Sequence, residues 1–253
     1  MNNHFNVFLL IRSWNSFQYF DNCINSVFQQ TDSDYQILFV DDNSDYSPSQ
    51  KKYIKSKLNN HKVIFNNNRK FALRNAVQVI NQYVHSPDDV VVNLDSDDWL
   101  LDKNAISIIR ETYSRHNCDF TYGDCQEFIN GRLSINSSKA LFPTNHRYPE
   151  QVEKNNLYRL EHFRPNHLRT WKAGIFKSIN ESAFKDRNGQ WIKFNEDLAI
   201  FFPLLELSKG NYKVIDKSLY AYNCSNPLND KKINLKQKLE EEIYLRSQRP
   251  YGT

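Results

Sequence analysis

The sequence predicts a single α/β domain in which helices flank a mainly parallel central sheet. The first half of the chain alternates short β-branched or aromatic runs with helical patterns, which is typical of successive βαβ units. The chain has 253 residues, of which 40% are hydrophobic and 25% charged, so it can bury one large core. Its apolar runs are much shorter than the roughly 20 residues of a membrane span, and the N-terminal run lacks the basic lead and cleavage site of a signal peptide. We therefore expect a soluble, unprocessed protein.

Strands and helices are expected to alternate through the first 120 residues. The strands fall on apolar runs at 5–11, 35–40, 62–65 and 89–94, with a fifth at about 119–123. The helices are expected at 17–29, 48–58, 71–84 and 102–115. In the third helix Ala72, Ala76 and Ile80 recur at helical spacing, and Asp102 is the expected N-cap of the fourth. Each crossover between parallel strands is expected to be right-handed.

The second half of the chain has a looser pattern. Beyond Gly131 the sequence is polar and rich in proline, which predicts an inserted loop or lid. The elements expected after it are a strand near 167–171, a helix over 195–208, strands at 212–215 and 219–224, and a last helix from about residue 233. That last helix has Leu235, Leu239 and Ile243 on one face. We expect it to dock on the domain through this face, with a membrane-surface helix as the alternative.

Charge and cysteine content exclude some classes of function. The net charge is +4, without a long basic block, so a nucleic-acid partner is not expected. This balance suits an anionic small substrate or a weak peripheral membrane contact, although a mildly basic solvated surface is the preferred explanation. The cysteines are Cys23, Cys118, Cys125 and Cys224, and they lack the CxxC spacing of structural zinc sites. Reduced thiols in a cytoplasmic compartment are therefore expected.

The strongest chemical signal is a run of acids after the fourth expected strand. The apolar residues 90–92 lead into Asp95, Ser96, Asp97 and Asp98. Ligands of open α/β sheets bind beyond the carboxyl ends of strands, and clustered carboxylates there commonly hold a hard divalent cation. Mg²⁺ or Mn²⁺ would then join Asp97, with or without Asp95, to phosphate oxygens. A simple turn that caps the next helix is the alternative.

A second acidic strand end follows residues 35–40. Asp41 and Asp42 come directly after this strand, followed by Asn43 and Ser44. Two parallel strands would thus bring acids to the same sheet edge. A carboxylate there can accept the imide N–H of uracil or the hydroxyls of ribose, which suits a nucleotide. These residues also fit a cap for the helix that follows Pro48, and the two roles are compatible.

Three cations begin the helix that follows the third strand. They are Arg69, Lys70 and Arg74. Helix N-termini and guanidinium groups both favour anions, so this segment can hold a phosphate or contact a base. A solvated charged surface is the alternative.

Taken in order, these motifs resemble the inverting glycosyltransferase family 2. The resemblance rests on Ser13-Trp14-Asn15, on 41–44, on Arg74-Asn75 and on the DxD-like run 94–98. It covers roughly residues 5–125 well and continues loosely to about 230. It implies a single Rossmann-like GT-A domain over 1–230, with a nucleotide-sugar-binding half at 1–125 and a smaller acceptor-side half at 126–230. The segment 231–253 would then be a C-terminal amphipathic helix and tail.

The resemblance also implies roles for individual residues. In the family, the acid after the second strand contacts uracil, the Arg before Asn approaches the base or phosphates, and the DxD acids hold ribose and metal. The implied nucleotide-sugar-binding residues are Ser13, Trp14, Asp41, Lys70, Arg74, Asp95 and Ser96. The implied metal ligands are Asp97, Asp95 and His167, for Mn²⁺ or Mg²⁺. His167 can also be a diphosphate contact, or a hydrogen-bonded structural residue.

An acidic pair in the second half completes the resemblance. Glu196 and Asp197 stand at the start of a predicted helix, where the family carries its catalytic base, and Asp197 is the preferred candidate. A plain N-terminal cap is the alternative reading of this pair. The chain departs from the family pattern at Arg12, where Pro or Thr is common, at Asn43 and at Lys70.

The expected function is therefore transfer of a hexose, with inversion, from a nucleotide-diphosphate sugar to an acceptor hydroxyl. A UDP-sugar is the first-choice donor, and the acceptor is a glycan or another molecule with a hydroxyl group. One alternative is a nucleotidyltransferase that makes nucleotide sugars, but such enzymes place a Gly-rich signature at the first strand and this chain has no glycine before Gly123. The other alternative is a non-catalytic nucleotide-sugar-binding or scaffold domain, against which Asp197 argues.

Overall fold

A computed structural model describes residues 5–134, 146–228 and 234–251 of the protein. Its strands are β1 (Val7–Ser13), β2 (Gln36–Asp41), β3 (Lys62–Phe65), β4 (Val90–Asp95), β5 (Trp99–Leu100), β6 (Phe120–Ile129), β7 (Arg132–Leu133), β8 (Asn166–Lys172) and β9 (Tyr212–Asn223). Its α-helices are α1 (Phe17–Phe28), α2 (Pro48–Lys57), α3 (Phe71–Tyr83), α4 (Ala105–His116), α5 (Glu150–Lys154), α6 (Ala173–Lys177), α7 (Glu196–Ser208) and α9 (Leu235–Ser247). Two 3₁₀ turns are η2 (Tyr158–Leu160) and η3 (Glu181–Phe184). No helix in these parts of the chain has the length and apolar character needed to cross a membrane.

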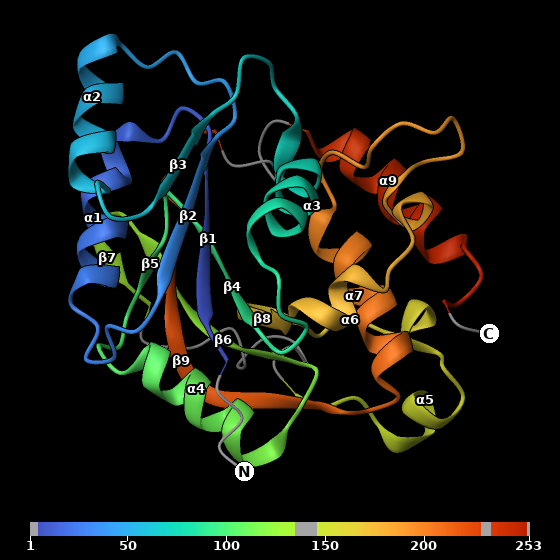
Figure 1. Ribbon diagram of the computed structural model, residues 1–253. Helices are drawn as coiled ribbons and strands as arrows, with labels where there is room; N and C mark the ends of the chain where they lie inside the picture. The colour runs from blue at the N-terminus through green and yellow to red at the C-terminus, as the bar shows by residue number, and fades with distance from the viewer. Residues whose placement is uncertain (1–4, 135–145, 229–233, 252–253) are drawn as a thin grey trace.

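The first four strands form the predicted parallel half of the sheet. The order of the sheet is β3-β2-β1-β4-β8-β6-β9-β5, with β7 paired to β6 (Figure 1). In this half β1 pairs in parallel with β2 and with β4, so Ser13 lies opposite Asp41 and Arg12 lies opposite Asp95. The acids that follow β2 and β4 therefore meet at one sheet edge, as predicted.

Beyond β4 the sheet is mixed. β8 runs antiparallel to both β4 and β6, whereas β6 and β9 are parallel. The two strands predicted at 212–215 and 219–224 are one continuous strand, β9, whose pairing with β6 shifts register around Asp124. The short strand β5 was not predicted, because its two residues owe their strand conformation to antiparallel pairing with β9.

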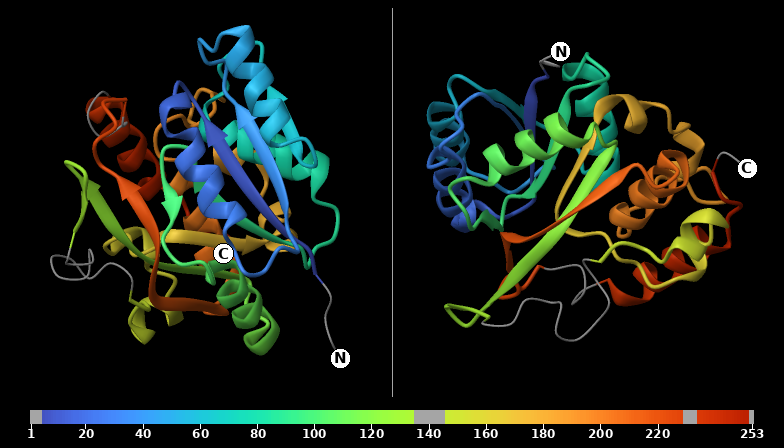
Figure 2. Two further views of the ribbon diagram at one scale, coloured as in Figure 1. Left: turned by 90° about the vertical axis from the view of Figure 1, so that its left-hand side faces the viewer. Right: turned by 90° about the horizontal axis from the view of Figure 1, so that it is seen from below.

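Helices cover both faces of the sheet, so central strands such as β1 and β4 are buried on both sides. Alternate residues of β1 point to opposite faces: Leu9 and Ile11 pack with α1, α2 and α4, while Leu10 packs with α3, α6 and α7. Figures 1 and 2 show these two helical layers on either side of the sheet. The expected cap Asp102 is not the N-cap of α4, which is Asn104; Asp102 instead accepts the backbone N–H of Asn104 in the preceding turn.

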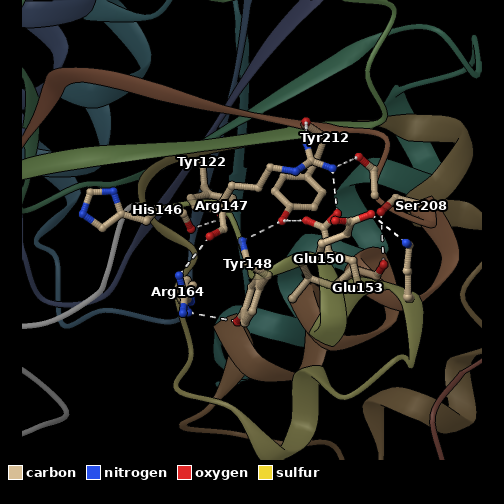
Figure 3. A network of polar contacts seen from close by, with 12 residues as sticks. Tyr122, His146, Arg147, Tyr148, Glu150, Glu153, Arg164, Ser208 and Tyr212 are labelled. Carbon is tan, nitrogen blue, oxygen red and sulfur yellow. Dashed lines mark hydrogen bonds and ion pairs between the residues drawn. The ribbon is translucent and has the colours of Figure 1, made fainter.

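The segment after residue 145 packs onto the domain through a polar network around Tyr212 (Figure 3). The Tyr212 hydroxyl accepts the backbone N–H of Tyr148 and donates to Glu153 Oε1 at 2.5 Å. Arg147 binds the same carboxylate, with 2.8 Å between Nη2 and Oε2, and the Tyr148 hydroxyl accepts the backbone N–H of Arg164. Most of the predicted loop is thus an anchored segment that leads into β8; residues 135–145 of that prediction lie outside the described residues.

The C-terminal helix α9 docks through a different face from the one predicted. Leu235, Leu239 and Ile243 are 58%, 51% and 70% exposed, which corrects the expectation that they form the docking face. Leu245 is buried instead, and α9 packs on α7 and η2. The physical reason is that polar contacts orient this helix: Arg159 in η2, for example, donates to the carbonyl of Leu245 at 2.5 Å.

Candidate active site

A cavity of about 490 Å³ opens at the carboxyl ends of the parallel strands. Its wall includes the ends of β1 and β4, the start of α3, the segment 163–169, the start of α7, the region after β9 and one residue of α9. Ligands of open α/β sheets bind beyond the carboxyl ends of the strands where the strand order reverses, which in this sheet is between β1 and β4.

The acids after β4 occupy one side of this cavity. Burial, reinforced by the charge of Asp95, raises the pKa of Asp97 to about 6, although a 2.7 Å hydrogen bond from Asn226 acts in the opposite direction. Asp98 is fully buried, and it accepts the Tyr220 hydroxyl at 2.6 Å and the backbone N–H of Asn223 at 2.7 Å. Asp98 therefore ties this turn to β9, and Asp95, Asp97 and Asp98 all line the cavity.

Arg12 links the acids after β4 to the acids of α7. Its Nη2 lies 2.6 Å from Asp95 Oδ1, and its Nη1 pairs with Glu196 Oε1. Burial lowers the pKa of Arg12, but the charges of Glu196 and Asp95 outweigh this and raise it above its usual value. Sequence reasoning noted Arg12 only as a departure from the family. Its place immediately before Ser13-Trp14, at the end of a buried strand, is a signal from which its position at the cavity could have been predicted.

The acidic pair at the start of α7 has two distinct environments. The Glu196 side chain is 13% exposed; burial raises its pKa, and the neighbouring Arg12 opposes that rise. The Asp197 side chain is 24% exposed, and its Oδ2 lies 3.3 Å from Nη2 of Arg169. Both carboxylates line the cavity, and Asp197 is the more accessible of the two.

Aromatic and cationic groups near the start of α3 also line the cavity. The Arg69 guanidinium lies 3.4 Å from the centre of the Trp14 ring and 4.4 Å from that of Phe71. Asp42 accepts the backbone N–H groups of Lys70 and Phe71, at 2.7 and 2.9 Å. Asp42 thus anchors the start of α3. The alternative prediction, that residues 42–44 cap α2, is wrong, because Ser47 is the N-cap of α2 and forms a capping box with Gln50.

The predicted donor residues divide into two groups. Those on the cavity wall are Ser13, Trp14, Asp95 and Ser96. Those off the wall formed by the described residues are Asp41, Lys70 and Arg74. Asp41 is fully buried, where it accepts the hydroxyl and the backbone N–H of Ser44, while Lys70 Nζ contacts Gln78 and the Arg74 guanidinium lies over the ring of Trp191. Sequence order alone did not separate Asp41 from its neighbour Asp42, which does line the cavity.

The predicted metal ligands Asp95, Asp97 and His167 all line the cavity. Within the described part of the chain, however, no three His, Cys, Asp or Glu side chains come together as a complete metal site. The His167 ring stacks on Tyr220, with 4.4 Å between ring centres. Two oxygen-donor carboxylates still suit Mg²⁺ or a similar cation, which commonly takes one or two protein carboxylates and completes its shell with substrate phosphates and water.

Comparison with known proteins identifies relatives of this architecture. The model of glycosyl transferase family 2 matches residues 9–179. Among solved structures, residues 1–349 of S. aureus TarS in complex with UDP-GlcNAc match with a TM-score of 0.61 and 17% identity, covering 89% of this chain and 60% of that one. The same protein in complex with UDP matches with a TM-score of 0.60 and 17% identity, covering 95% of this chain and 64% of that one. A search of curated proteins found no match.

These matches confirm the predicted fold class, a single mixed α/β domain of the GT-A type. This chain spans less than two thirds of the length of the TarS structures it resembles. At 17% identity this likeness shows the fold alone.

Proposed function

This chain belongs to glycosyl transferase family 2, and we propose that it transfers a sugar, with inversion, from a UDP-sugar to an acceptor hydroxyl. One observation carries the proposal. A single cavity brings the Asp95–Asp97 edge of the parallel sheet together with the Glu196–Asp197 pair of α7. The first is suited to a nucleotide diphosphate and the second to proton removal.

The donor is proposed to bind along the ends of β1, β2 and β4. Ser13, Trp14, Asp95 and Ser96 are the proposed contacts, because they line this edge of the cavity. The stacked Trp14 and Arg69 side chains offer a planar cationic surface for a base or a phosphate. Asp41, at the end of β2, and Lys70 and Arg74, at the start of α3, do not line the cavity and are proposed to support the residues that contact the donor. The TarS complexes with UDP-GlcNAc and UDP support the choice of a UDP-sugar.

A divalent cation, Mn²⁺ or Mg²⁺, is proposed to be held by Asp97 and Asp95, with His167 as a further candidate ligand or diphosphate contact. When bound, it would neutralise charge on the departing diphosphate. The raised pKa of Asp97 fits this role, since a buried carboxylate beside another carboxylate is stabilised by a cation.

Asp197 is the proposed general base. It would accept the proton of the acceptor hydroxyl as that oxygen attacks the anomeric carbon, while the diphosphate leaves from the opposite face of the sugar. This single displacement inverts the anomeric centre. Glu196 is proposed to stay ionised and bound to Arg12, so it holds the start of α7 in place and leaves proton transfer to its neighbour.

The proposal is tested first by ligand binding. Thermal unfolding is measured with UDP, GDP, CDP and TDP, each with and without Mn²⁺, on the wild type and on Asp97→Asn. A ligand at about 100 times its dissociation constant stabilises a protein by roughly 2.7 kcal/mol, which such a scan detects. We expect a shift with UDP that needs Mn²⁺ and is lost in the variant. No shift with any nucleotide would contradict the donor site.

Transfer itself is then followed as release of UDP from UDP-GlcNAc, with and without candidate glycan acceptors. Metal-dependent binding of UDP without any release would favour the non-catalytic binding domain. Formation of a nucleotide sugar from a nucleoside triphosphate and a sugar phosphate would favour the nucleotidyltransferase. A cytoplasmic location stays a prediction.

A further inference from the structure

A carboxylate of the C-terminal helix binds the backbone directly before the acidic pair of α7. Glu241 Oε1 accepts the N–H of Lys193 at 2.8 Å, and its Oε2 accepts the N–H groups of Phe194 and Asn195 at 2.8 and 3.0 Å. The Asn195 side chain also donates to the carbonyl of Lys238, one turn earlier in α9. Three consecutive backbone donors thus converge on one carboxylate, and hydrogen bonds to a carboxylate are of the stronger, charge-assisted kind.

These contacts lie at the start of α7. Asn195 is its N-cap, and its side chain makes no capping bond within α7 because it is turned toward α9. The residues held by Glu241 also reach the donor end of the cavity: the Phe194 ring packs edge-on against Phe71, with 5.6 Å between centres, and Lys193 Nζ lies 5.4 Å from the same ring.

The side of α9 that faces the domain carries both polar and apolar side chains. Lys238 lines the cavity, and Glu241 and Leu245 follow it at spacings of three and four residues, so all three share one helix face. The apolar residues Leu235, Leu239 and Ile243 lie on the other side and are exposed. On the side of α9 that faces the domain, Lys238 therefore lines the cavity, Glu241 binds the segment before α7, and Leu245 is buried.

We infer that α9 is part of the active site and that Glu241 is a positioning residue for Asp197. This inference rests on the proposed function. Glu241 holds residues 193–195 in place, and these residues set the direction from which the Asp197 carboxylate enters the cavity. A displacement of about 1 Å in a catalytic group can cost about 100-fold in rate.

Glu241→Gln isolates this contact. The amide keeps one acceptor oxygen, but its NH₂ group would face backbone N–H donors. The helix stays attached in the variant, because Arg159 and Arg246 hold it through main-chain carbonyls. Glu240→Gln is the matched control, since the Glu240 side chain is exposed. Its ion pair with Lys236, one turn earlier in α9, is long, with 3.9 Å between Oε1 and Nζ. Glu241→Asp, which keeps the charge, serves as the conservative variant.

Two measurements test the inference. The first is kcat for UDP-GlcNAc hydrolysis together with the dissociation constant of UDP in Mn²⁺. We expect Glu241→Gln to lower kcat about 10- to 100-fold and to change the dissociation constant of UDP less than about threefold. Glu241→Asp should recover part of the lost kcat, and Glu240→Gln should have no effect. The positioning role would be overturned if Glu241→Gln had the same kcat as Glu240→Gln, or if its affinity for UDP fell by as large a factor as its kcat.

The second measurement does not depend on activity. Hydrogen exchange of the amides of 193–195 is expected to be at least tenfold faster in Glu241→Gln than in Glu240→Gln, with no change in β1 or β4. Unchanged exchange would overturn the inference even in an active enzyme. A wild type that binds no nucleotide would count against the proposed function instead, while the exchange result still decides whether Glu241 holds this segment.

Discussion

Arg12 and Asp95 lie opposite each other on the paired strands β1 and β4 and form an ion pair, with 2.6 Å between Nη2 and Oδ1. The same guanidinium pairs with Glu196 of α7. Because the Arg12 side chain is only 7% exposed, this cation joins the donor-side and acceptor-side acids where water screens them little. The two halves of the cavity are thereby connected through one side chain.

Arg12→Met is expected to destabilise the fold, because it leaves the buried Glu196 carboxylate without its cation. Removing one partner of a buried pair costs about 3 kcal/mol or more, and urea unfolding near neutral pH measures it. Arg12→Lys keeps the charge but loses the two-pronged geometry, so its loss should be smaller. If Arg12→Met is as stable as the wild type, the pair adds nothing to the fold.

The raised pKa of Asp97 predicts how stability depends on pH in the metal-free protein. Its folded pKa of about 6 lies above the ordinary value of 3.8, so the fold favours the protonated form. The resulting stabilisation is fully present below about pH 4 and is lost as pH rises through about 6. The shift corresponds to roughly 3 kcal/mol at most. Urea unfolding in EDTA at pH 4.5 and 7.5 measures it.

Asp97→Asn is the comparison for that pH dependence, since the amide does not titrate. The stability of the variant relative to the wild type should increase between pH 4.5 and 7.5. A constant difference across this range would mean that Asp97 has an ordinary pKa.

Asp197→Asn should abolish proton removal and leave donor binding intact. General-base catalysis contributes typically 10²- to 10⁴-fold, so kcat is expected to fall by about that factor while the dissociation constant of UDP stays the same. Steady-state kinetics and calorimetric titration separate the two effects. Retention of full kcat would assign the base to another group.

Arg69→Met is expected to weaken UDP binding about tenfold, which corresponds to about 1.4 kcal/mol. The variant removes the cation that lies over Trp14 and keeps an unbranched side chain in its place. Trp14→Phe retains a ring at the same position and should bind UDP better than Trp14→Ala. Equal affinity in all three variants and the wild type would place the nucleotide elsewhere in the cavity.

Local pattern was a sound guide to the parallel half of the sheet. The spacing of apolar residues predicted β1 to β4 and the helices between them. The acidic runs at 41–42 and 95–98 stand at the ends of β2 and β4, so their common sheet edge could also be predicted. The same reasoning split β9 and assigned the wrong docking face to α9. Both errors arose because the deciding contacts join residues far apart in the chain.

The sequence by itself therefore determined the alternation of strands and helices, the family, and the set of acids available at one sheet edge. Only the tertiary structure decided which of those acids face the cavity, that Arg12 binds Asp95 and Glu196, and that Glu241 holds the start of α7. The physical reason is that strand and helix periodicity is a property of neighbouring residues. An ion pair or a convergent set of N–H donors instead depends on distances between elements, which are set only when the whole core packs.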